Sequence, residues 1–462
     1  MNYLFFSTLS QMGFWITWLL IPILVETVPA ISSFVKIFFY TIGKPKSEKD
    51  PSFWPFISII IPVYNSEDTL YECIQSVYQS TYPIDKIQVI VVDNKSQDKS
   101  FKAFQSAQNS FPKLNMQWMK TEQGKARALN SAIYSSSGAY IINIDSDGIL
   151  ERNALKNLIK KFESDTTISA MTGSILTQKS LIKSTKNVGL KWLQRLEYFE
   201  YAQAFMSGRS IESQNNHLYT MSGAFSGFRK DALMKTFMYD VSTVGEDIDI
   251  TFQVRDKAKG KVILCADAFF FVDPIESWNK LYTQRQRWQR GQIEVSQKYS
   301  GNRLGLKSFF SNFLVRRLII DHTFMFLKTI WLFASIALLF LNYSPLLLLL
   351  SYVAIYLLYV FMSTMVFVNV NMMLKKFSDE RTFYFSLFDC VFWMPIYNFI
   401  LSWVRLIGVI NTEYLSAKWA TKNYHEEFKT VGTIVKQDFI KIKGGRKNEF
   451  SRYLSSEILH PC

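Results

Sequence analysis

The stretch "ISIIIPVYN" at residues 57–65 is an unbroken apolar run that ends in polar residues. Two further stretches have the same form, "QVIVVDN" at 88–94 and "YIINIDSDG" at 140–148. Unbroken apolar strands are typical of a sheet that is covered on both faces. Helical patterns alternate with these strands, as in 66–80 and 124–136. The alternation predicts an α/β fold with a mostly parallel sheet and right-handed crossovers.

Long apolar tracts flank this α/β region. Residues 3–25 carry no charge and are long enough to cross about 30 Å of hydrocarbon as a helix. Residues 27–42 are apolar again and predict a second short span or an interfacial helix. Further apolar tracts lie at 322–342, 345–374 and 384–410, and the last of them would span, re-enter or lie in the interface. The pattern predicts a multi-pass membrane protein.

The boundaries of these tracts predict five parts. They are an N-terminal transmembrane part at 1–50, a cytoplasmic domain at 51–273, interface helices at 274–321, a C-terminal transmembrane region at 322–410 and a basic tail at 411–462. Lysines follow the N-terminal tracts at positions 44, 46 and 49, which places the next domain in the cytoplasm.

The overall charge is strongly basic, with a formal net charge of +14. A nucleic-acid-binding protein would also be basic, but the apolar tracts favour a membrane protein, whose Lys and Arg remain on the cytoplasmic side. We therefore expect no nucleic-acid partner. The four cysteines are scattered, which argues against a disulfide scaffold or a zinc site and suits a reducing compartment.

Three predicted strands end in polar side chains where an open α/β sheet binds its ligands. Tyr64 and Asn65 follow the first strand, Asp93 ends the second, and Asp145 and Asp147 end the third. Two carboxylates that are two residues apart can share a divalent cation with a diphosphate, because Mg²⁺ and Mn²⁺ prefer hard oxygen ligands. Helix capping and Asx-turns are the plainer roles for such acids. Their number at one sheet edge favours a site.

Two charged groups follow in the chain. Lys125 lies at the start of a predicted helix, where an ammonium and the helix N-terminus both favour a phosphate. The stretch "TVGEDIDITFQV" at 243–254 supplies Glu246, Asp247 and Asp249. These acids would act as ordinary N-terminal helix charges or as a catalytic carboxylate group.

The stretch "TQRQRWQRGQ" at 283–292 gathers arginines around a tryptophan. One interpretation is a basic helix lying on lipid headgroups. The other is a site that holds anionic phosphate and stacks a flat group. Both can apply, with Arg285 and Arg290 facing headgroups while Arg287 and Trp288 serve the site.

These motifs, in this order, resemble the family-2 glycosyltransferases. The resemblance rests on PVYN, the VVDN strand end, GKARALN, DSD, SGAF, GED and Gln-x-x-Arg-Trp at 284–288. It is most similar to the processive membrane group, which includes cellulose, chitin, hyaluronan and poly-N-acetylglucosamine synthases. The wider run at 269–292 looks most like the bacterial exosortase-associated glycosyltransferases. The resemblance implies a GT-A-type nucleotide-sugar-binding domain.

The resemblance also implies roles for individual residues. Those expected to bind the UDP-sugar are Tyr64, Asn65, Asp93, Lys125, Asp145, Gln284 and Arg287. Asp145 and Asp147 would hold Mg²⁺ or Mn²⁺, and Asp247 with Glu246 would form the catalytic pair, with Asp247 as general base. Ser222, Gly223 and Trp288 would contact the acceptor.

Two positions depart from the family pattern. Ser66 stands where the family often has Glu, and Asn94 stands where it often has a second Asp.

The expected function is transfer of sugar, with inversion, from a UDP-sugar to a growing polysaccharide that leaves through the protein's own helices. The expected partners are the donor, the polysaccharide acceptor, membrane lipid and accessory export proteins. Two alternatives are kept. One is a non-processive transferase that adds a single sugar to a lipid or short glycan. The other is a degenerate, non-catalytic assembly partner.

Overall fold

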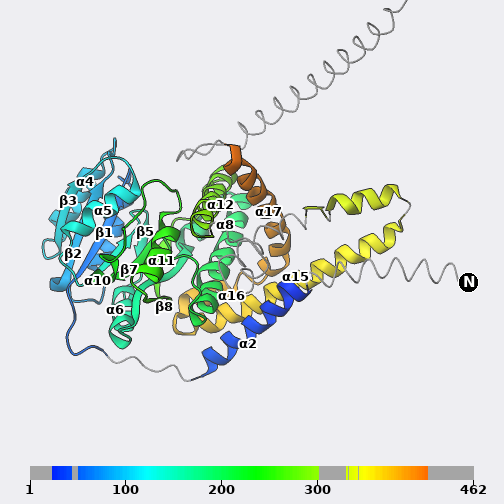
Figure 1. The fold of residues 1–462 in the computed structure, drawn as a ribbon, viewed down its shortest axis with the longest axis horizontal. Coiled ribbons are helices and arrows are strands. Elements are labelled where there is room, and N and C mark those ends of the chain that lie inside the picture. The colour runs from blue at the N-terminus through cyan, green and yellow to red at the C-terminus, as the bar shows by residue number, and fades with distance from the viewer. Residues whose placement is uncertain (1–22, 44–49, 301–328, 331, 342, 415–462) are drawn as a thin grey trace, which may run out of the picture.

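The computed structural model describes residues 23–43, 50–300, 329–330, 332–341 and 343–414. Most of the expected N-terminal span, part of the expected interface region and most of the basic tail lie outside the described residues. The described chain forms a sheet with its covering helices at one end and a group of long helices at the other (Figure 1).

The sheet has eight strands in the order β3-β2-β1-β4-β7-β6-β8-β5. The strands are β1 (Ile57–Val63), β2 (Ile87–Asp93), β3 (Asn115–Lys120), β4 (Tyr140–Ile144), β5 (Gly148–Leu150), β6 (Ile168–Thr177), β7 (Phe225–Arg229) and β8 (Lys261–Val272). The pairs β1–β2, β1–β4, β2–β3 and β6–β8 are parallel. The pairs β4–β7, β6–β7 and β5–β8 are antiparallel. The predicted mostly parallel α/β fold is confirmed.

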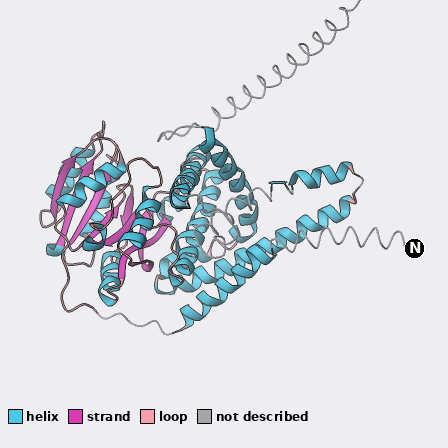
Figure 2. Ribbon diagram, in the orientation of Figure 1, coloured by secondary structure: helices cyan, strands magenta, loops and turns pink. Residues whose placement is uncertain are grey.

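The central strands form the core because they are apolar along their whole length. Every residue of β1, β2 and β4 is buried, since helices cover both faces of the sheet (Figure 2). Val63 pairs with Asp93 and Ile60 pairs with Asn143. This register brings the carboxyl ends of the three strands to one edge, as their sequence pattern predicted.

Helices of 4 to 12 residues connect the strands. They are α3 (Leu70–Tyr78), α4 (Ser100–Ser110), α5 (Lys125–Ser135), α6 (Ala154–Ser164), α10 (Lys230–Leu233) and α11 (Glu246–Lys257). Their apolar sides pack on the sheet, as Leu155, Leu158 and Phe162 of α6 do.

The second group of helices lies beside the sheet. It includes α7 (Lys179–Ser184), α8 (Val188–Tyr201), the π-helical η3 (Ala202–Gly208), α9 (Arg209–Gln214), α12 (Trp278–Ser300), α15 (Pro345–Met373), α16 (Ser378–Phe385) and α17 (Cys390–Tyr414). The N-terminal α2 (Val28–Ile42) lies along α15, where Thr27 Oγ1 donates to Met362 Sδ at 3.5 Å (Figure 1).

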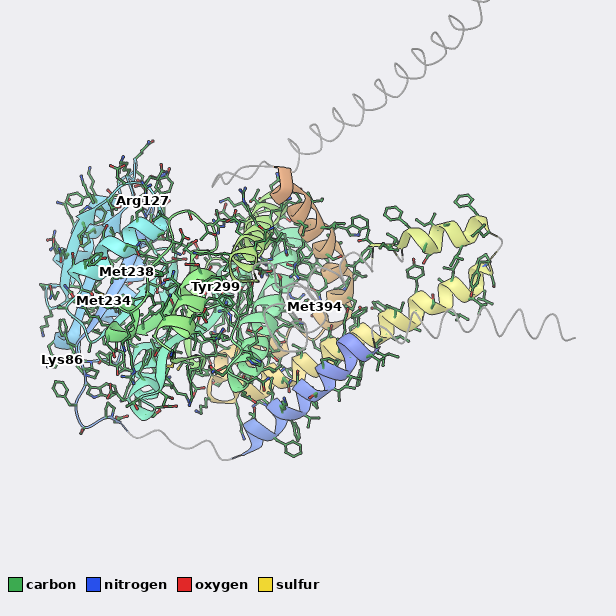
Figure 3. All side chains as sticks on the ribbon, viewed as in Figure 1. Lys86, Arg127, Met234, Met238, Tyr299 and Met394 are labelled. Carbon is green, nitrogen blue, oxygen red and sulfur yellow. The ribbon has the colours of Figure 1, made fainter. Side chains whose placement is uncertain are left out.

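Two described helices are long and apolar enough to cross a membrane, Pro345–Lys376 and Cys390–Val409. Many apolar side chains on α15 are exposed in the described part of the chain, including Leu346, Leu349 and Leu357. Figure 3 shows side chains that project outward along this helix. A water-soluble helix would bury such a surface. The exposed face therefore favours a membrane location for this end of the molecule.

Candidate active site

Lys125 lies at the centre of the candidate site. It is the first residue of α5, and it follows Gly124, whose φ of +135° is accessible only to glycine without strain. The Lys125 ammonium donates to Asp145 Oδ1 and, at 3.1 Å, to the carbonyl oxygen of Gly223. These contacts join the end of β4, the start of α5 and the loop before β7.

Asp247 reaches the same point from the N-terminus of α11. A Cβ built on Gly223 would lie 3.5 Å from Lys125 Nζ and 3.6 Å from Asp247 Oδ2. Asn143 Nδ2 donates to the Gly223 carbonyl at 3.1 Å and fixes this loop against β4. Four residues that the sequence places far apart, Lys125, Asp145, Gly223 and Asp247, thus meet at the carboxyl edge of the sheet.

The electrostatics of this cluster are those of crowded carboxylates around the Lys125 ammonium, with arginines nearby. Burial alone would lower the pKa of Lys125, but the charges of Asp145, Glu246 and Asp247 raise it above its usual value. Burial and the neighbouring Asp247 raise the pKa of Glu246 to about 7, against the opposing charges of Lys125 and Arg287. Burial also raises the pKa of Asp247. Carboxyl groups perturbed in this way are typical of functional sites.

Asp147 is the second acid of the Asp-Ser-Asp motif. Burial and the nearby charge of Asp145 raise the pKa of Asp147 to about 6, although Lys125 opposes the shift. A divalent cation would relieve this repulsion. Within the described chain, no group of three or more His, Cys, Asp or Glu side chains could hold a metal alone. One or two carboxylates suffice where substrate phosphates and water complete the coordination, as is usual for Mg²⁺. The two aspartates therefore fit a metal–diphosphate site.

The loops after β1 and β2 are tied together beside the motif. Asn65 has a φ of 51°, and its side-chain oxygen accepts from the backbone N–H of Gln97 at 2.9 Å. Asp93 Oδ1 accepts from the backbone N–H of Ser96 at 2.8 Å, so this acid also shapes its own turn. Tyr64 is 48% exposed, which leaves this residue accessible to a ligand.

Ser66 connects this loop to the aspartates. Its hydroxyl lies 2.8 Å from that of Ser146, the residue between Asp145 and Asp147. The position that departs from the family pattern thus holds the first loop against the Asp-Ser-Asp turn.

Helix α12 crosses the start of α11 at very close range. A Cβ on Gly291 would lie 2.9 Å from Gly245 Cα, and a Cβ on Gly245 would lie 2.7 Å from the Gly291 carbonyl oxygen. Glu294 accepts from Thr243 Oγ1 at 2.9 Å and from the Val244 N–H at 3.2 Å. This crossing brings Arg287 close enough to Glu246 to act on its pKa.

Arg285 and Arg290 differ from the expectation that both face lipid headgroups. Arg285 is buried with 2% of its surface exposed, and its Nη2 donates to Glu200 Oε2 at 2.6 Å. Tyr397 of α17 donates to the same carboxylate oxygen at 2.9 Å. Arg290 donates to Glu294 at 2.8 Å. The expectation was wrong because both arginines have carboxylate partners within the protein.

Trp288 lies over this buried arginine. The Arg285 guanidinium is 4.2 Å from the centre of the Trp288 ring, and Phe205 packs edge-on against the ring at 5.9 Å. The Gln284 side-chain oxygen accepts from Arg285. Trp288 is partly buried, and its contacts with Arg285 and Phe205 fix the position of the ring.

Ser222 holds the turn before β7. Its N–H donates to Thr172 Oγ1 at 2.9 Å, and its hydroxyl accepts from the Ala224 N–H at 3.3 Å. These bonds keep Gly223 next to Lys125.

Three residues near the site were not identified from the sequence. Arg209, at the start of α9, lowers the pKa of Asp247, and Asp273 raises that of Asp147. Cys73 Sγ lies 3.5 Å from the carbonyl oxygen of Asp145. None of them stands in a spacing that predicts a site. The fold alone brings these three residues close to the site.

Comparisons with known proteins agree with this geometry. Residues 58–237 match the family model described as "Glycosyl transferase family 2". A poly-beta-1,6-N-acetyl-D-glucosamine synthase from Staphylococcus aureus is 25% identical over 264 residues, which are 56% of this chain and 58% of that protein. The enzyme of the same name from Staphylococcus epidermidis is 24% identical over 52% of this chain and 55% of its own length. This chain thus spans little more than half the length of these curated relatives.

A solved structure gives the same fold. The mannosyltransferase PcManGT from Pyrobaculum calidifontis, in complex with GDP-Man and Mn²⁺, superposes with a TM-score of 0.57 and 17% sequence identity. The match covers 84% of this chain and 96% of that one. The sheet therefore has the GT-A glycosyltransferase fold, and the chain carries a family-2 glycosyltransferase domain at 58–237.

Proposed function

We propose that this chain, which carries a family-2 glycosyltransferase domain, is a membrane-embedded inverting transferase that extends a polysaccharide from a UDP-sugar. The observation that carries the proposal is the meeting of Lys125, Asp145, Gly223 and Asp247 at the carboxyl edge of the sheet. Arg287 of the overlying helix α12 acts on the same group of charges. Such an arrangement offers cations to a diphosphate and a carboxylate to an incoming hydroxyl.

The donor would lie across the loops that follow β1, β2 and β4. The uracil would lie against Tyr64, Asn65 and Asp93. Tyr64 is exposed, and the Asn65 side chain holds the neighbouring loop by accepting from the Gln97 N–H. Lys125, Gln284 and Arg287 would face the diphosphate. Asp145 would contact the nucleotide and, with Asp147, hold Mg²⁺ or Mn²⁺. The metal, when bound, would supply positive charge to the leaving diphosphate.

Asp247 is proposed as the general base, with Glu246 beside it. Its carboxylate would take the proton from an acceptor hydroxyl as that oxygen bonds to the anomeric carbon of the donor. The bond from that carbon to the diphosphate oxygen breaks, and UDP leaves with its electron pair. Attack from the opposite face inverts the configuration. Lys125 and Arg287 would stabilise the charge that develops on the diphosphate.

The acceptor would approach from the side of α12. Ser222 and Gly223 would line its path, and the ring of Trp288 would stack on its terminal sugar. α12 also contacts the apolar helix α17, since a Cβ on Gly408 would lie 3.4 Å from Gln289 Cβ. We propose that the growing chain leaves through the helices of 322–410. The proposed catalytic domain at 51–273 is cytoplasmic, and the proposed interface helices at 274–321 connect it to the membrane region. Accessory proteins would assist export.

The test is release of UDP by the purified protein. UDP-glucose, UDP-N-acetylglucosamine, UDP-glucuronate and UDP-galactose are each supplied with Mg²⁺ or Mn²⁺. We expect UDP release with at least one donor and a product of many sugars. Release with a one-sugar product would replace the polymerase by a single-sugar transferase. No release with any donor would support a non-catalytic assembly partner instead.

A further inference from the structure

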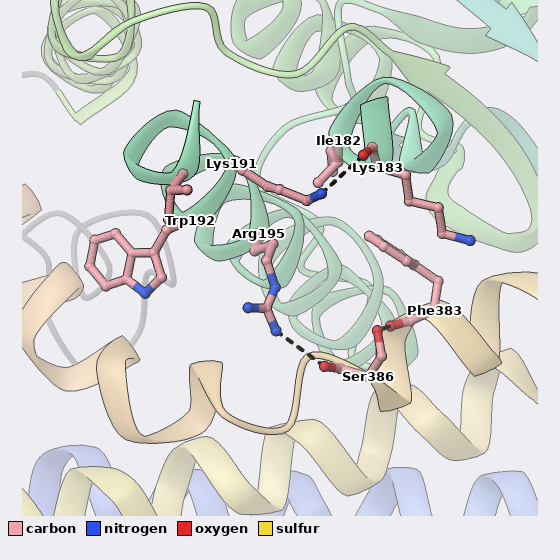
Figure 4. A pocket seen from close by; sticks show the side chains of 8 residues that line it. Ile182, Lys183, Lys191, Trp192, Arg195, Phe383 and Ser386 are labelled. Carbon is pink, nitrogen blue, oxygen red and sulfur yellow. Dashed lines mark hydrogen bonds between the residues drawn. The ribbon is translucent and has the colours of Figure 1, made fainter. Parts of the chain in front are cut away.

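A cavity of about 350 Å³ lies away from the catalytic edge, between α7, α8 and α16. Figure 4 shows Lys183, Lys191, Trp192 and Arg195 around it, with Phe383 on the α16 side. The three cationic side chains come from α7 and α8, and α16 contributes Phe383 to the opposite wall. The site described above does not use any of these residues.

One face of α8 forms most of the wall. Val188, Lys191, Trp192 and Arg195 recur at spacings of three and four residues, so they lie on the same side of the helix. Lys191 Nζ donates to the backbone carbonyl of Lys183 at 3.0 Å. This bond ties the Lys191 ammonium to α7, while the Lys183 side chain extends separately towards the Phe383 ring.

Only one of the three cations is neutralised by a nearby acid. Arg195 donates to Asp389 Oδ1 at 2.5 Å and to the Ser386 carbonyl at 3.2 Å. Lys183 instead lies 5.5 Å from the centre of the Phe383 ring. Within the described residues, neither Lys183 nor Lys191 is paired with a carboxylate. The cavity therefore keeps a net positive charge that suits an anion.

The surroundings of the cavity are apolar and exposed. α16 connects α15 to α17, the two helices long enough to cross a membrane. Phe385, Phe388 and Trp393 are exposed beside it, and Trp192 meets Trp393 edge-on at 5.5 Å. Exposed aromatic rings next to basic side chains mark the boundary between membrane and water.

We propose that this cavity binds the phosphate headgroup of an anionic phospholipid from the surrounding bilayer. The proposal rests on the membrane location proposed above. A volume near the lower end of ligand pockets, about 300 Å³, fits a headgroup but not a sugar polymer. Basic pockets beside membrane helices on the cytoplasmic side bind anionic headgroups by the same chemistry. The acyl chains would lie along the exposed aromatic rings, which a free phosphate could not use.

The test uses the full-length protein in detergent micelles. Phosphatidylglycerol and phosphatidylcholine with matched acyl chains are added, and retained lipid is measured by native mass spectrometry. We expect preferential retention of phosphatidylglycerol. The double variant Lys183→Gln with Lys191→Gln should weaken this retention by about tenfold or more, since each lysine near an anionic surface contributes about 1 kcal/mol. Lys186→Gln is the control, because Lys186 is exposed in the connection between α7 and α8 and does not line the cavity.

Several results would overturn the proposal. These are equal retention of the two lipids, unchanged retention in the double variant, or an equal loss in Lys186→Gln. Displacement of the lipid by millimolar inorganic phosphate would identify a free phosphate site instead. UDP release is measured on the same samples. Its absence in the wild-type protein would contradict the proposed function, while lipid retention would still be judged from the mass spectra.

Discussion

At the scale of single residues, two adjacent acids dominate the chemistry of the site. Burial and Asp247 raise the pKa of Glu246 from 4.5 to about 7. The folded state therefore holds this proton more tightly than the unfolded state. The contribution of Glu246 to stability is largest below pH 4.5 and falls as the pH rises towards about 7. The proposed catalysis needs the ionised form of the Glu246–Asp247 pair, because a protonated carboxyl group cannot accept a proton.

The first prediction is that UDP release rises with pH through an apparent pKa near 7. This apparent pKa belongs to the Glu246–Asp247 pair rather than to one residue. Glu246→Gln removes one of two neighbouring charges and should move the acidic limb to lower pH. The measurement is the pH dependence of kcat/KM for both proteins. An unmoved limb would mean that the two acids do not titrate together.

The second prediction concerns the metal. Asp147→Ala or a chelator should abolish UDP release. The melting temperature of Asp147→Ala should change little, because a charge buried next to Asp145 costs stability and the substitution removes that cost. Asp273→Asn is the control, since Asp273 lies near Asp147 but also bonds to Gln178 at 2.7 Å. That variant should keep its dependence on added Mg²⁺ or Mn²⁺. Full activity of Asp147→Ala in chelator would exclude the proposed metal role.

The third prediction separates the arginines of α12. Arg285→Gln breaks a buried ion pair with Glu200 and should lower the free energy of unfolding by about 3–5 kcal/mol. Arg290→Lys should cost about 1 kcal/mol or less, because a lysine can still pair with Glu294. Arg287→Lys should lower the rate with little loss of stability, since an ammonium cannot replace a planar guanidinium. Melting temperature and UDP release are measured for each.

The contacts of these three arginines could not be predicted from the sequence. A cluster of positive charge before an apolar tract predicts either a lipid-facing or a phosphate-binding helix. The partner that decides the matter for Arg285 is Glu200, which lies 85 residues earlier in the chain. No local spacing reports such a contact. If Arg285→Gln has the melting temperature of the wild-type protein, the buried contacts of Arg285 with Glu200 do not stabilise the fold.

At the scale of elements, the strand ends were the most predictable part of the site. An apolar run buried on both faces can only be a central strand, so the polar residues after it must lie at the sheet edge. Asp145 lies there as the strand pattern predicted, and Lys125 and Asp247 lie close to it. The sequence placed these two residues in the site only through the family resemblance. The antiparallel pairing of β7 between β4 and β6 was not foreseen, because strand pairing depends on contacts between distant segments.

The contact between α11 and α12 could not be predicted either, although it depends on two glycines. Gly245 and Gly291 allow the backbones to touch, and any side chain there would meet main-chain atoms. In a sequence, a glycine within a helical pattern indicates only a residue of low helix propensity. It does not indicate that another helix packs closely at that position. Its role becomes visible only when the partner helix is in place.

The fourth prediction tests this crossing. Gly291→Ala would place a Cβ 2.9 Å from Gly245 Cα and push α12 away from Glu246 and Asp247. We expect kcat to fall by up to about 10²-fold, because small displacements of catalytic groups are costly. Gly189→Ala is the control, since a Cβ there would meet only Asn187 Oδ1 at 3.5 Å. Equal kcat values for the two variants would show that the crossing does not position the site.

At the scale of the whole molecule, α12 links the catalytic edge to the apolar helices. It touches Gly245 before α11 on one side and Gly408 of α17 on the other. The ion pair of Arg285 with Glu200 extends this link to α8, and Tyr397 extends it to α17. A chain lengthened at the sheet edge would therefore start next to the helices through which it is proposed to leave.

The most direct test of the account is Asp247→Asn, examined for donor binding and sugar transfer in one preparation. The substitution keeps the shape and the hydrogen-bonding capacity of the side chain but removes the proton acceptor. We predict that the Kd for the UDP-sugar that supports turnover stays within about threefold, while transfer falls by about 10²-fold or more. Transfer at the wild-type rate, or a fall that matches a loss of donor affinity, would contradict the assignment of Asp247 as the base.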